Sequence, residues 1–215
     1  MPVEDDTLDQ LAQTLVEATK TQTPIDRLTA RYELSIQEAY EIQTRVINQR
    51  RADGAAVVGH KIGLTSEGIQ TQLGVDEPDY GHLLDSMRLE EPVVQSDDLI
   101  APRVEPELGF RIGERLEPPV TPRDVLAASD FVVPVFEVID SRIRDWDIQI
   151  QDTIADNASA AYYRVGNRST GTHTLDLSME GVKLYRNGVL EESGLSAAVL
   201  QHPARAVAWL ANTLT

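Results

Sequence analysis

The chain has 215 residues and no cysteine, which excludes disulfide frameworks, thiolate metal sites and cysteine nucleophiles. Its 35 acidic and 19 basic residues give a formal net charge of −16, and such a surface repels nucleic acid and anionic lipid. No apolar run approaches the roughly 20 residues needed to cross a bilayer. The acidic N-terminus lacks a signal-peptide pattern, so we expect a cytoplasmic protein without a membrane segment.

The N-terminal quarter is predicted to be helical. Apolar residues recur at helical spacing over residues 7–19, which predicts an amphipathic helix. Ser35 begins a second helix, because Glu38 three residues later can complete a capping box, and Gly54 ends that helix. Its apolar stripe is expected to comprise Ile36, Ala39, Tyr40, Val46 and Ile47.

After this helical part the pattern is typical of strands. Residues 55–64 predict a strand, and residues 65–81, rich in Gly, Asp and Pro, predict a long loop with one short helix. Thr121 and Pro122 are a good N-cap and first-turn pair for a short helix that ends at Ala128. Residues 131–139 form an apolar, β-branched run that is typical of a buried strand.

The last part of the chain contains a hairpin and a helix. Asn187-Gly188 lies between alternating segments within residues 182–190 and indicates a two-residue hairpin. Pro203 begins a final helix whose apolar face comprises Val207, Leu210, Ala211 and Leu214. We therefore predict one α+β domain over residues 1–215, with a helical part over residues 1–54 and a β-rich body over residues 55–215.

Three glutamates carry the strongest chemical signal. Alternation along residues 104–112 puts Glu105 and Glu107 on one face of a strand, about 7 Å apart at their backbones. The opposite face, which is expected to meet the core, carries Val104, Leu108, Phe110 and Ile112. Glu137 lies inside the apolar run at 131–139, where an unpaired carboxylate costs several kcal/mol or stays protonated.

Two explanations account for Glu137 equally well at this point. It is paired with an arginine such as Arg103, Arg111 or Arg142, or it shares a divalent cation with Glu105 and Glu107. In the first case Glu105 and Glu107 are ordinary residues on a solvated strand face. In the second case three carboxylates without a thiol form an all-oxygen site suited to Mg²⁺ or Mn²⁺.

Further polar residues are candidates for a site. Lys61 can neutralise a carboxylate or enolate, or it is a surface lysine at a strand end; His60, on the opposite face, is expected to be structural or exposed. Asp79, after a proline, belongs to a rigid loop that presents a carboxylate, or to an ordinary turn. Asn157 and Ser159 either bind substrate oxygens or cap a helix.

Five segments in this order resemble the 2-keto-4-pentenoate (2-hydroxypenta-2,4-dienoate) hydratases of the fumarylacetoacetate hydrolase superfamily. The resemblance covers the chain from about residue 30 to its end. The paired glutamates with a distant third are shared by the whole superfamily, whereas the first and fourth segments are similar to the hydratases and to their sister group, the 4-oxalocrotonate decarboxylases. The segments are GHKIGLTS, LGVDEPDYGHLLD, APRVEPELGF, VFEVIDSRIRDWDIQIQDTIADNAS and HPARAVAWLAN.

The resemblance implies a fold and a set of site residues. It implies a mixed β-roll with flanking helices, homo-oligomeric assembly and a bound Mg²⁺ or Mn²⁺. Relatives continue for some tens of residues past the last segment, so the chain is expected to be shortened at its C-terminus. The implied residues are the metal ligands Glu105, Glu107 and Glu137, the catalytic residues Lys61 and Asp79, and the substrate-binding residues Ser159 and Thr65.

The reaction implied by the resemblance belongs to aromatic meta-cleavage catabolism. A 2-hydroxy-2,4-dienoate ketonises to the 2-oxo-3-enoate, water adds at C4 and a proton is delivered to C3, which gives a 4-hydroxy-2-oxo acid. The nearest alternative is decarboxylation of the 4-oxalocrotonate type, and the next is acylpyruvate hydrolysis. A third alternative is a non-catalytic subunit that associates with a decarboxylase of the same pathway.

Overall fold

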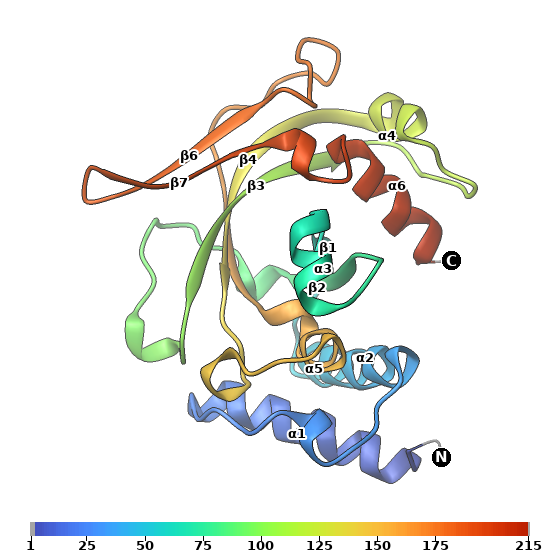
Figure 1. Cartoon of the computed structure of the whole chain (residues 1–215), viewed down its shortest axis with the longest axis vertical. Helices are drawn as coiled ribbons and strands as arrows, with labels where there is room; N and C mark the ends of the chain where they lie inside the picture. Colours follow the sequence, from blue (N-terminus) through green and yellow to red (C-terminus); the bar gives the residue numbers. More distant parts are fainter. Residues whose placement is uncertain (1–2, 215) are drawn as a thin grey trace. The chain divides into compact units, whose positions relative to one another are not determined.

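The computed structural model describes residues 3–214 and confirms a mixed helix-and-sheet fold, although helices also occur throughout the expected β-rich body (Figure 1). Among these residues no helix is both long enough and apolar enough to cross a membrane. The strands form sheets with the orders β1-β2, β3-β4-β5 and β6-β7. The α-helices are α1 (Asp5–Thr21), α2 (Ile36–Ala52), α3 (Glu67–Leu73), α4 (Pro122–Ala128), α5 (Ile150–Ala155) and α6 (Pro203–Thr213). The strands are β1 (Val57–Gly63), β2 (Asp79–Leu84), β3 (Arg103–Ile112), β4 (Ser129–Ile139), β5 (Ala160–Val165), β6 (Gly181–Arg186) and β7 (Val189–Leu195).

The chain divides into two compact units, each built from several segments. The first unit contains the residues up to Gly63, 79–105 and 137–164, and the second contains 64–78, 106–136 and the residues from Val165 onward. The strands β3 and β4 each begin in one unit and end in the other. The single domain expected from the sequence stays a prediction.

The core of the first unit lies between α1, α2 and α5 (Figure 1). The predicted capping box is present at the start of α2, because Ser35 and Glu38 each accept a hydrogen bond from the other's main-chain N–H. Most of the predicted stripe of α2 packs inward, but Ile36 at its first position is 43% exposed. The buried core residues are Leu8, Leu11, Ala12, Leu15, Leu28, Leu34, Ala39, Ile42, Ile143, Ile154 and Ala155.

The second unit has a smaller core between α4 and α6. The helix α4 begins as predicted, with the Thr121 side chain capping the helix and Pro122 at its first position. Leu214, which was expected on the buried face of the last helix, lies beyond its end and is exposed. The buried core residues are Val120, Val125, Ala204 and Ala208.

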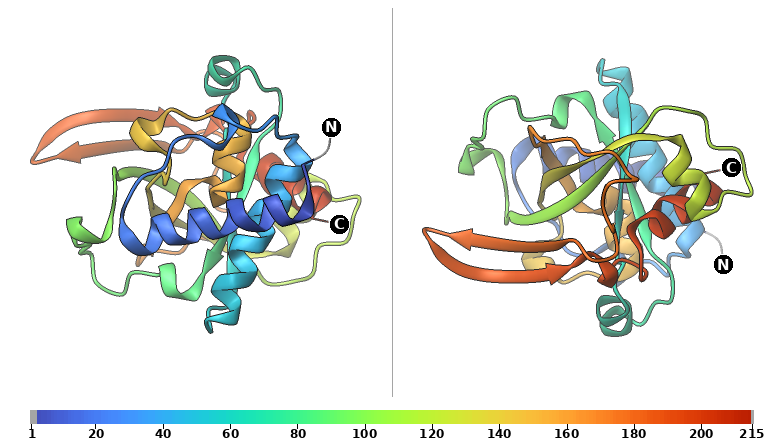
Figure 2. Two further views of the ribbon diagram at one scale, coloured as in Figure 1. Left: turned by 90° about the horizontal axis from the view of Figure 1, so that it is seen from below. Right: turned by 90° about the horizontal axis from the view of Figure 1, so that it is seen from above.

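The hairpin of β6 and β7 forms around the predicted dipeptide and appears as a narrow ribbon in Figure 2. Both turn residues are left-handed, with φ values of 53° at Asn187 and 82° at Gly188, as a type I′ turn requires. Every residue of β7 is exposed. The apolar residues of this hairpin therefore do not contribute to the core of the second unit.

Three strand predictions need correction. Residues 129–139 form β4, but Phe136 is 50% exposed, so this strand is buried on one face only over part of its length. Val104 is 49% exposed rather than in the core. The loop expected to continue to residue 81 ends earlier, because Asp79 begins β2 and pairs with Gly63 of β1.

Candidate functional site

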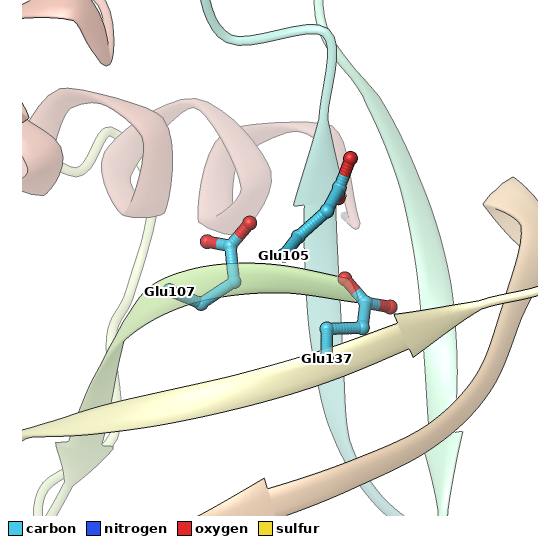
Figure 3. Close-up of side chains that lie close together, drawn as sticks. All are labelled: Glu105, Glu107 and Glu137. Atoms are coloured by element: carbon cyan, nitrogen blue, oxygen red, sulfur yellow. The ribbon is translucent and has the colours of Figure 1, made fainter. Parts of the chain in front are cut away.

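The structure brings the three predicted glutamates together. Glu105 and Glu107 rise from the same face of β3, and Glu137 rises from the neighbouring strand β4 (Figure 3). One carboxylate oxygen from each residue lies within 4.8 Å of the corresponding oxygens of the other two. Glu107 is exposed and Glu137 is buried, so the cluster has one open side and one side inside the protein.

The charge partner of Glu137 is a lysine, and the predicted arginine pairing is wrong. The Nζ atom of Lys61 lies 3.2 Å from Oε2 of Glu137, and the two side chains are 10% and 4% exposed. Arg142 instead pairs with Asp156, and Arg103 lies over the ring of Trp146. The surface-lysine interpretation of Lys61 is therefore also excluded.

Asp79 is a buried strand residue rather than part of a presenting loop. It is 2% exposed, and its Oδ1 atom has no hydrogen-bond partner among the described residues. Its carboxylate lies against the backbone of Gly63, its register partner on β1. A side chain on Gly63 would occupy that space, so glycine is needed there for the carboxylate to keep its position.

Burial raises the pKa of both inner carboxyl groups. Desolvation is the largest effect at Glu137 and at Asp79, and the ammonium of Lys61 lowers both pKa values in opposition. Glu105 adds to the increase at each group because its negative charge is near. The ammonium of Lys61 therefore acts on both inner carboxyl groups and opposes the effect of their burial.

These carboxylates fit a hard divalent cation. The donor set is entirely oxygen, which suits Mg²⁺, Mn²⁺ or Ca²⁺. Oε1 of Glu137 is buried and has no hydrogen-bond partner among the described residues, although a buried carboxylate oxygen normally has one. A cation among Glu105, Glu107 and Glu137 would satisfy that oxygen.

A left-handed turn between α5 and β5 completes the site in the first unit. Asn157, Ala158 and Ser159 have φ values of 55°, 49° and 55°, which are unusual for three successive residues with side chains. The carbonyl of Ala158 accepts a hydrogen bond from Nζ of Lys61 at 3.1 Å. The carbonyl of Ala158 in the turn and the carboxylate of Glu137 on β4 therefore both contact the ammonium of Lys61.

The two residues expected to bind substrate occupy different places. Ser159 is 2% exposed, and its Oγ atom has no hydrogen-bond partner among the described residues. Thr65 lies in the second unit just before α3, where its carbonyl accepts a hydrogen bond from the N–H of Leu200. Asn157, for which both substrate binding and capping were open, directs its amide to the main chain of His82.

One face of the two-stranded β1-β2 sheet carries an aromatic cluster that the sequence patterns did not predict. His60 and His82 are register partners whose ring centroids lie 5.0 Å apart, and Tyr80 stacks on Tyr40 of α2 at 4.6 Å. Burial, together with the nearby His82, lowers the pKa of His60 to about 4. Alternation along the strands separates this cluster from Lys61 and Asp79.

Buried amides and close main-chain contacts around β2 were also missed. Gln43 of α2 donates hydrogen bonds to the carbonyls of Tyr80 and Ile154 at 2.9 Å and 2.8 Å. A Cβ atom on Gly81 would lie 2.5 Å from the carbonyl oxygen of Asn157, so this position requires glycine. The one available signal was a glutamine at a core position of an otherwise apolar helix stripe.

Comparisons with known proteins agree on one family, although no family model matches the chain. The chain is 44% identical to a 2-hydroxyhexa-2,4-dienoate hydratase of Comamonas testosteroni over 207 residues, 94% of this chain and 78% of that protein. It is 45% identical to a 2-hydroxypent-2,4-dienoate hydratase of Pseudomonas putida over 210 residues, 96% of this chain and 93% of that protein.

Among solved structures, the chain is similar to the 4-oxalocrotonate decarboxylase of Pseudomonas putida G7, complexed with magnesium and adipate. The TM-score is 0.95 at 35% sequence identity, over 99% of this chain and 82% of that one. The identity to the hydratases is higher and extends over almost the whole chain. The chain therefore belongs to the 2-keto-4-pentenoate hydratase family.

Proposed function

We propose that this protein is a metal-dependent hydratase that adds water to a 2-hydroxy-2,4-dienoate and forms a 4-hydroxy-2-oxo acid. The observation that carries the proposal is the convergence of Glu105, Glu107 and Glu137 beside the buried Lys61, in a chain 44% and 45% identical to two dienoate hydratases. Such a cluster supplies both a cation site and a buried positive charge next to it.

We propose Mg²⁺ as the cation, with Mn²⁺ as the alternative, held by Glu105, Glu107 and Glu137. The magnesium complex of the decarboxylase with the same fold supports this choice. When bound, the cation would supply a Lewis acid that polarises the oxygens of a 2-oxo acid. Lys61 favours the ionised form of Glu137, because its ammonium opposes the increase that burial causes in the pKa of that carboxyl.

The chain's own residues have separate tasks in this reaction. Lys61 balances negative charge at the C1 and C2 end of the substrate from its place beside Glu137. Asp79 is the candidate acid or base for ketonisation and water addition, because burial raises the pKa of its carboxyl and favours a bound proton. Ser159, buried and with an unsatisfied hydroxyl, is the candidate donor to a substrate oxygen, and Thr65 is a second candidate substrate contact.

The remaining features implied by the resemblance are part of the same proposal. They are a mixed β-roll fold, homo-oligomeric assembly, a cytoplasmic location and association with a decarboxylase of the pathway. The α+β class and the similarity to a solved decarboxylase support the fold. The similarity to a 4-oxalocrotonate decarboxylase, which is 40% identical over 184 residues, supports the link to that pathway.

The direct test follows the ultraviolet absorbance of 2-hydroxypenta-2,4-dienoate as the conjugated dienol is consumed. We expect loss of absorbance in Mg²⁺, formation of 4-hydroxy-2-oxopentanoate by mass spectrometry, and loss of activity in a chelator. Glu137→Gln should be inactive, whereas Glu117→Gln on the exposed loop before α4 should match the unaltered protein. Full activity in chelator would contradict the metal-dependent reaction.

Decarboxylation is the second candidate, and the TM-score of 0.95 to a 4-oxalocrotonate decarboxylase favours it. The two reactions share a 2-oxo acid but differ in product, because only decarboxylation releases CO₂. Incubation with 2-oxo-3-hexenedioate and measurement of released CO₂ separates them. Rapid release from that substrate, without hydration of the dienoate, would replace the hydratase proposal with the decarboxylase.

A further inference from the structure

Asn157 joins two parts of the site that are far apart in the chain. Its Oδ1 atom accepts a hydrogen bond from the N–H of His82 at 2.7 Å, and its Nδ2 atom donates to the carbonyl of the same residue at 2.9 Å. The residue is 3% exposed, so water competes little with this pair. The amide therefore holds β2 against the turn that begins at Asn157.

This turn also places a main-chain carbonyl, that of Ala158, beside Lys61. A run of left-handed residues that carry side chains persists only where the surroundings enforce it. Here the amide pair provides that constraint, together with the close approach of Gly81 to the carbonyl of Asn157. As a result the carbonyl of Ala158 points at Nζ of Lys61, which lies 3.1 Å away.

We propose that Asn157 is a positioning residue for Lys61, an inference that rests on the role proposed above for that lysine. Without the amide pair the turn relaxes toward ordinary backbone angles, and the carbonyl of Ala158 leaves the ammonium. Lys61 then loses one of the contacts that hold it beside Glu137. A misplaced charged group slows the chemical step more than it weakens substrate binding.

The test uses lysine reactivity in the metal-free protein, so it does not depend on catalysis. The chain has three lysines, and Lys20 and Lys183 are exposed and serve as internal references. The protein in chelator is treated with limiting acetic anhydride, and each lysine is quantified by peptide mass spectrometry. Asn157→Gly, which keeps the left-handed backbone but lacks the amide, should acetylate Lys61 several-fold faster than the unaltered protein.

The matched control is Gln43→Ala, which removes the buried amide that α2 directs to the same strand, β2. Gln43 donates its hydrogen bonds to the carbonyls of Tyr80 and Ile154, and none of the hydrogen bonds of the described residues joins its side chain to the turn at Asn157. We expect it to lower the melting temperature as Asn157→Gly does, while the acetylation of Lys61 stays unchanged. Asn157→Asp, similar in shape and still an acceptor for His82, should fall between the unaltered protein and Asn157→Gly.

Kinetics supply the second readout. In Mg²⁺, Asn157→Gly should lower kcat by about tenfold or more while KM stays within about twofold. Equal acetylation of Lys61 in all four proteins would overturn the positioning role. An unaltered protein that fails to hydrate the dienoate would contradict the proposed function alone, because the acetylation result is obtained without substrate.

Discussion

The Nζ atom of Lys61 lies 3.2 Å from Oε2 of Glu137, and both side chains are almost completely enclosed. Lys61 comes from β1 and Glu137 from β4, so this ion pair connects two different sheets of the fold. It also puts the positive charge of Lys61 beside the cluster of carboxylates. No other basic side chain among the described residues forms an ion pair with Glu137.

Replacement of Lys61 by methionine should destabilise the metal-free protein. The substitution keeps the length of the side chain but leaves Glu137 buried without its partner, and the loss of one member of a buried pair costs about 3 kcal/mol or more. Urea unfolding in chelator measures the effect. Lys183→Met on the exposed hairpin is the control and should unfold at the same urea concentration as the unaltered protein. An unchanged midpoint for Lys61→Met would show that the pair adds nothing to stability.

Replacement of Glu105 or Glu107 by glutamine should weaken cation binding. Each substitution removes one negative charge and one strong oxygen donor from the cluster, so Mg²⁺ affinity should fall by about tenfold or more. Isothermal titration calorimetry with MgCl₂ measures this affinity directly. The exposed Glu114, which lies just after β3, offers the matched control Glu114→Gln. If that control weakened binding equally, the effect would come from overall charge and not from the cluster.

Two glycines should resist substitution by alanine. A Cβ atom on Gly63 would collide with the carboxylate of Asp79, and one on Gly81 would lie 2.5 Å from the carbonyl oxygen of Asn157. Both variants should melt at lower temperature and lose activity. Gly68, inside α3, has open space around it and ordinary helical angles, so Gly68→Ala should be neutral or slightly stabilising. Differential scanning calorimetry of the three variants distinguishes collision from a general effect of alanine.

His60 should make the protein less stable as the solution is acidified below pH 6.5, whereas Asp79, Glu137 and Asp156, whose pKa values burial raises, contribute in the opposite direction. Burial lowers the pKa of His60 to about 4 in the folded protein, against 6.5 in the unfolded chain, and burial also lowers the pKa of His82. Between pH 6.5 and about 4, His60 therefore binds a proton in the unfolded chain but not in the folded protein. Its contribution to the free energy of unfolding becomes smaller as the pH is lowered through this range. Below that range both states are protonated and His60 adds no further change.

Urea unfolding at a series of pH values tests this dependence. His60→Asn, which is uncharged at every pH, should show a shallower decrease than the unaltered protein. His173→Asn replaces an exposed histidine of the second unit and should keep the full slope. A slope that is the same in all three proteins would assign the acid sensitivity to other groups.

Local signals predicted their elements well because neighbouring residues determine them. The capping box at Ser35, the N-cap at Thr121 and the hairpin turn at Asn187 each depend on a few adjacent side chains and backbone angles. The strand β2 was missed because Gly81 and polar residues interrupt its alternation. Its position depends on distant amides, Gln43 and Asn157, which no local pattern reveals.

The candidate site was predictable in its members but not in its pairing. Alternation placed Glu105 and Glu107 on one face, and the apolar surroundings of Glu137 showed that its charge needed compensation. That the compensation comes from Lys61 depends on how β1 approaches β4, which is a long-range property of the fold. The resemblance to the hydratases supplied the roles of Lys61 and Asp79, which spacing alone left open.

The side-chain hydrogen bonds that hold the main chain of β2 have a consequence for redesign of this enzyme. Gln43 and Asn157 both bind main-chain atoms, namely the carbonyl of Tyr80 and the N–H and carbonyl of His82. Substitution of the Tyr80 or His82 side chain leaves these hydrogen-bonding groups in place. The main-chain hydrogen bonds that hold β2 therefore survive substitution of either side chain, whereas the stacking of Tyr80 on Tyr40 does not.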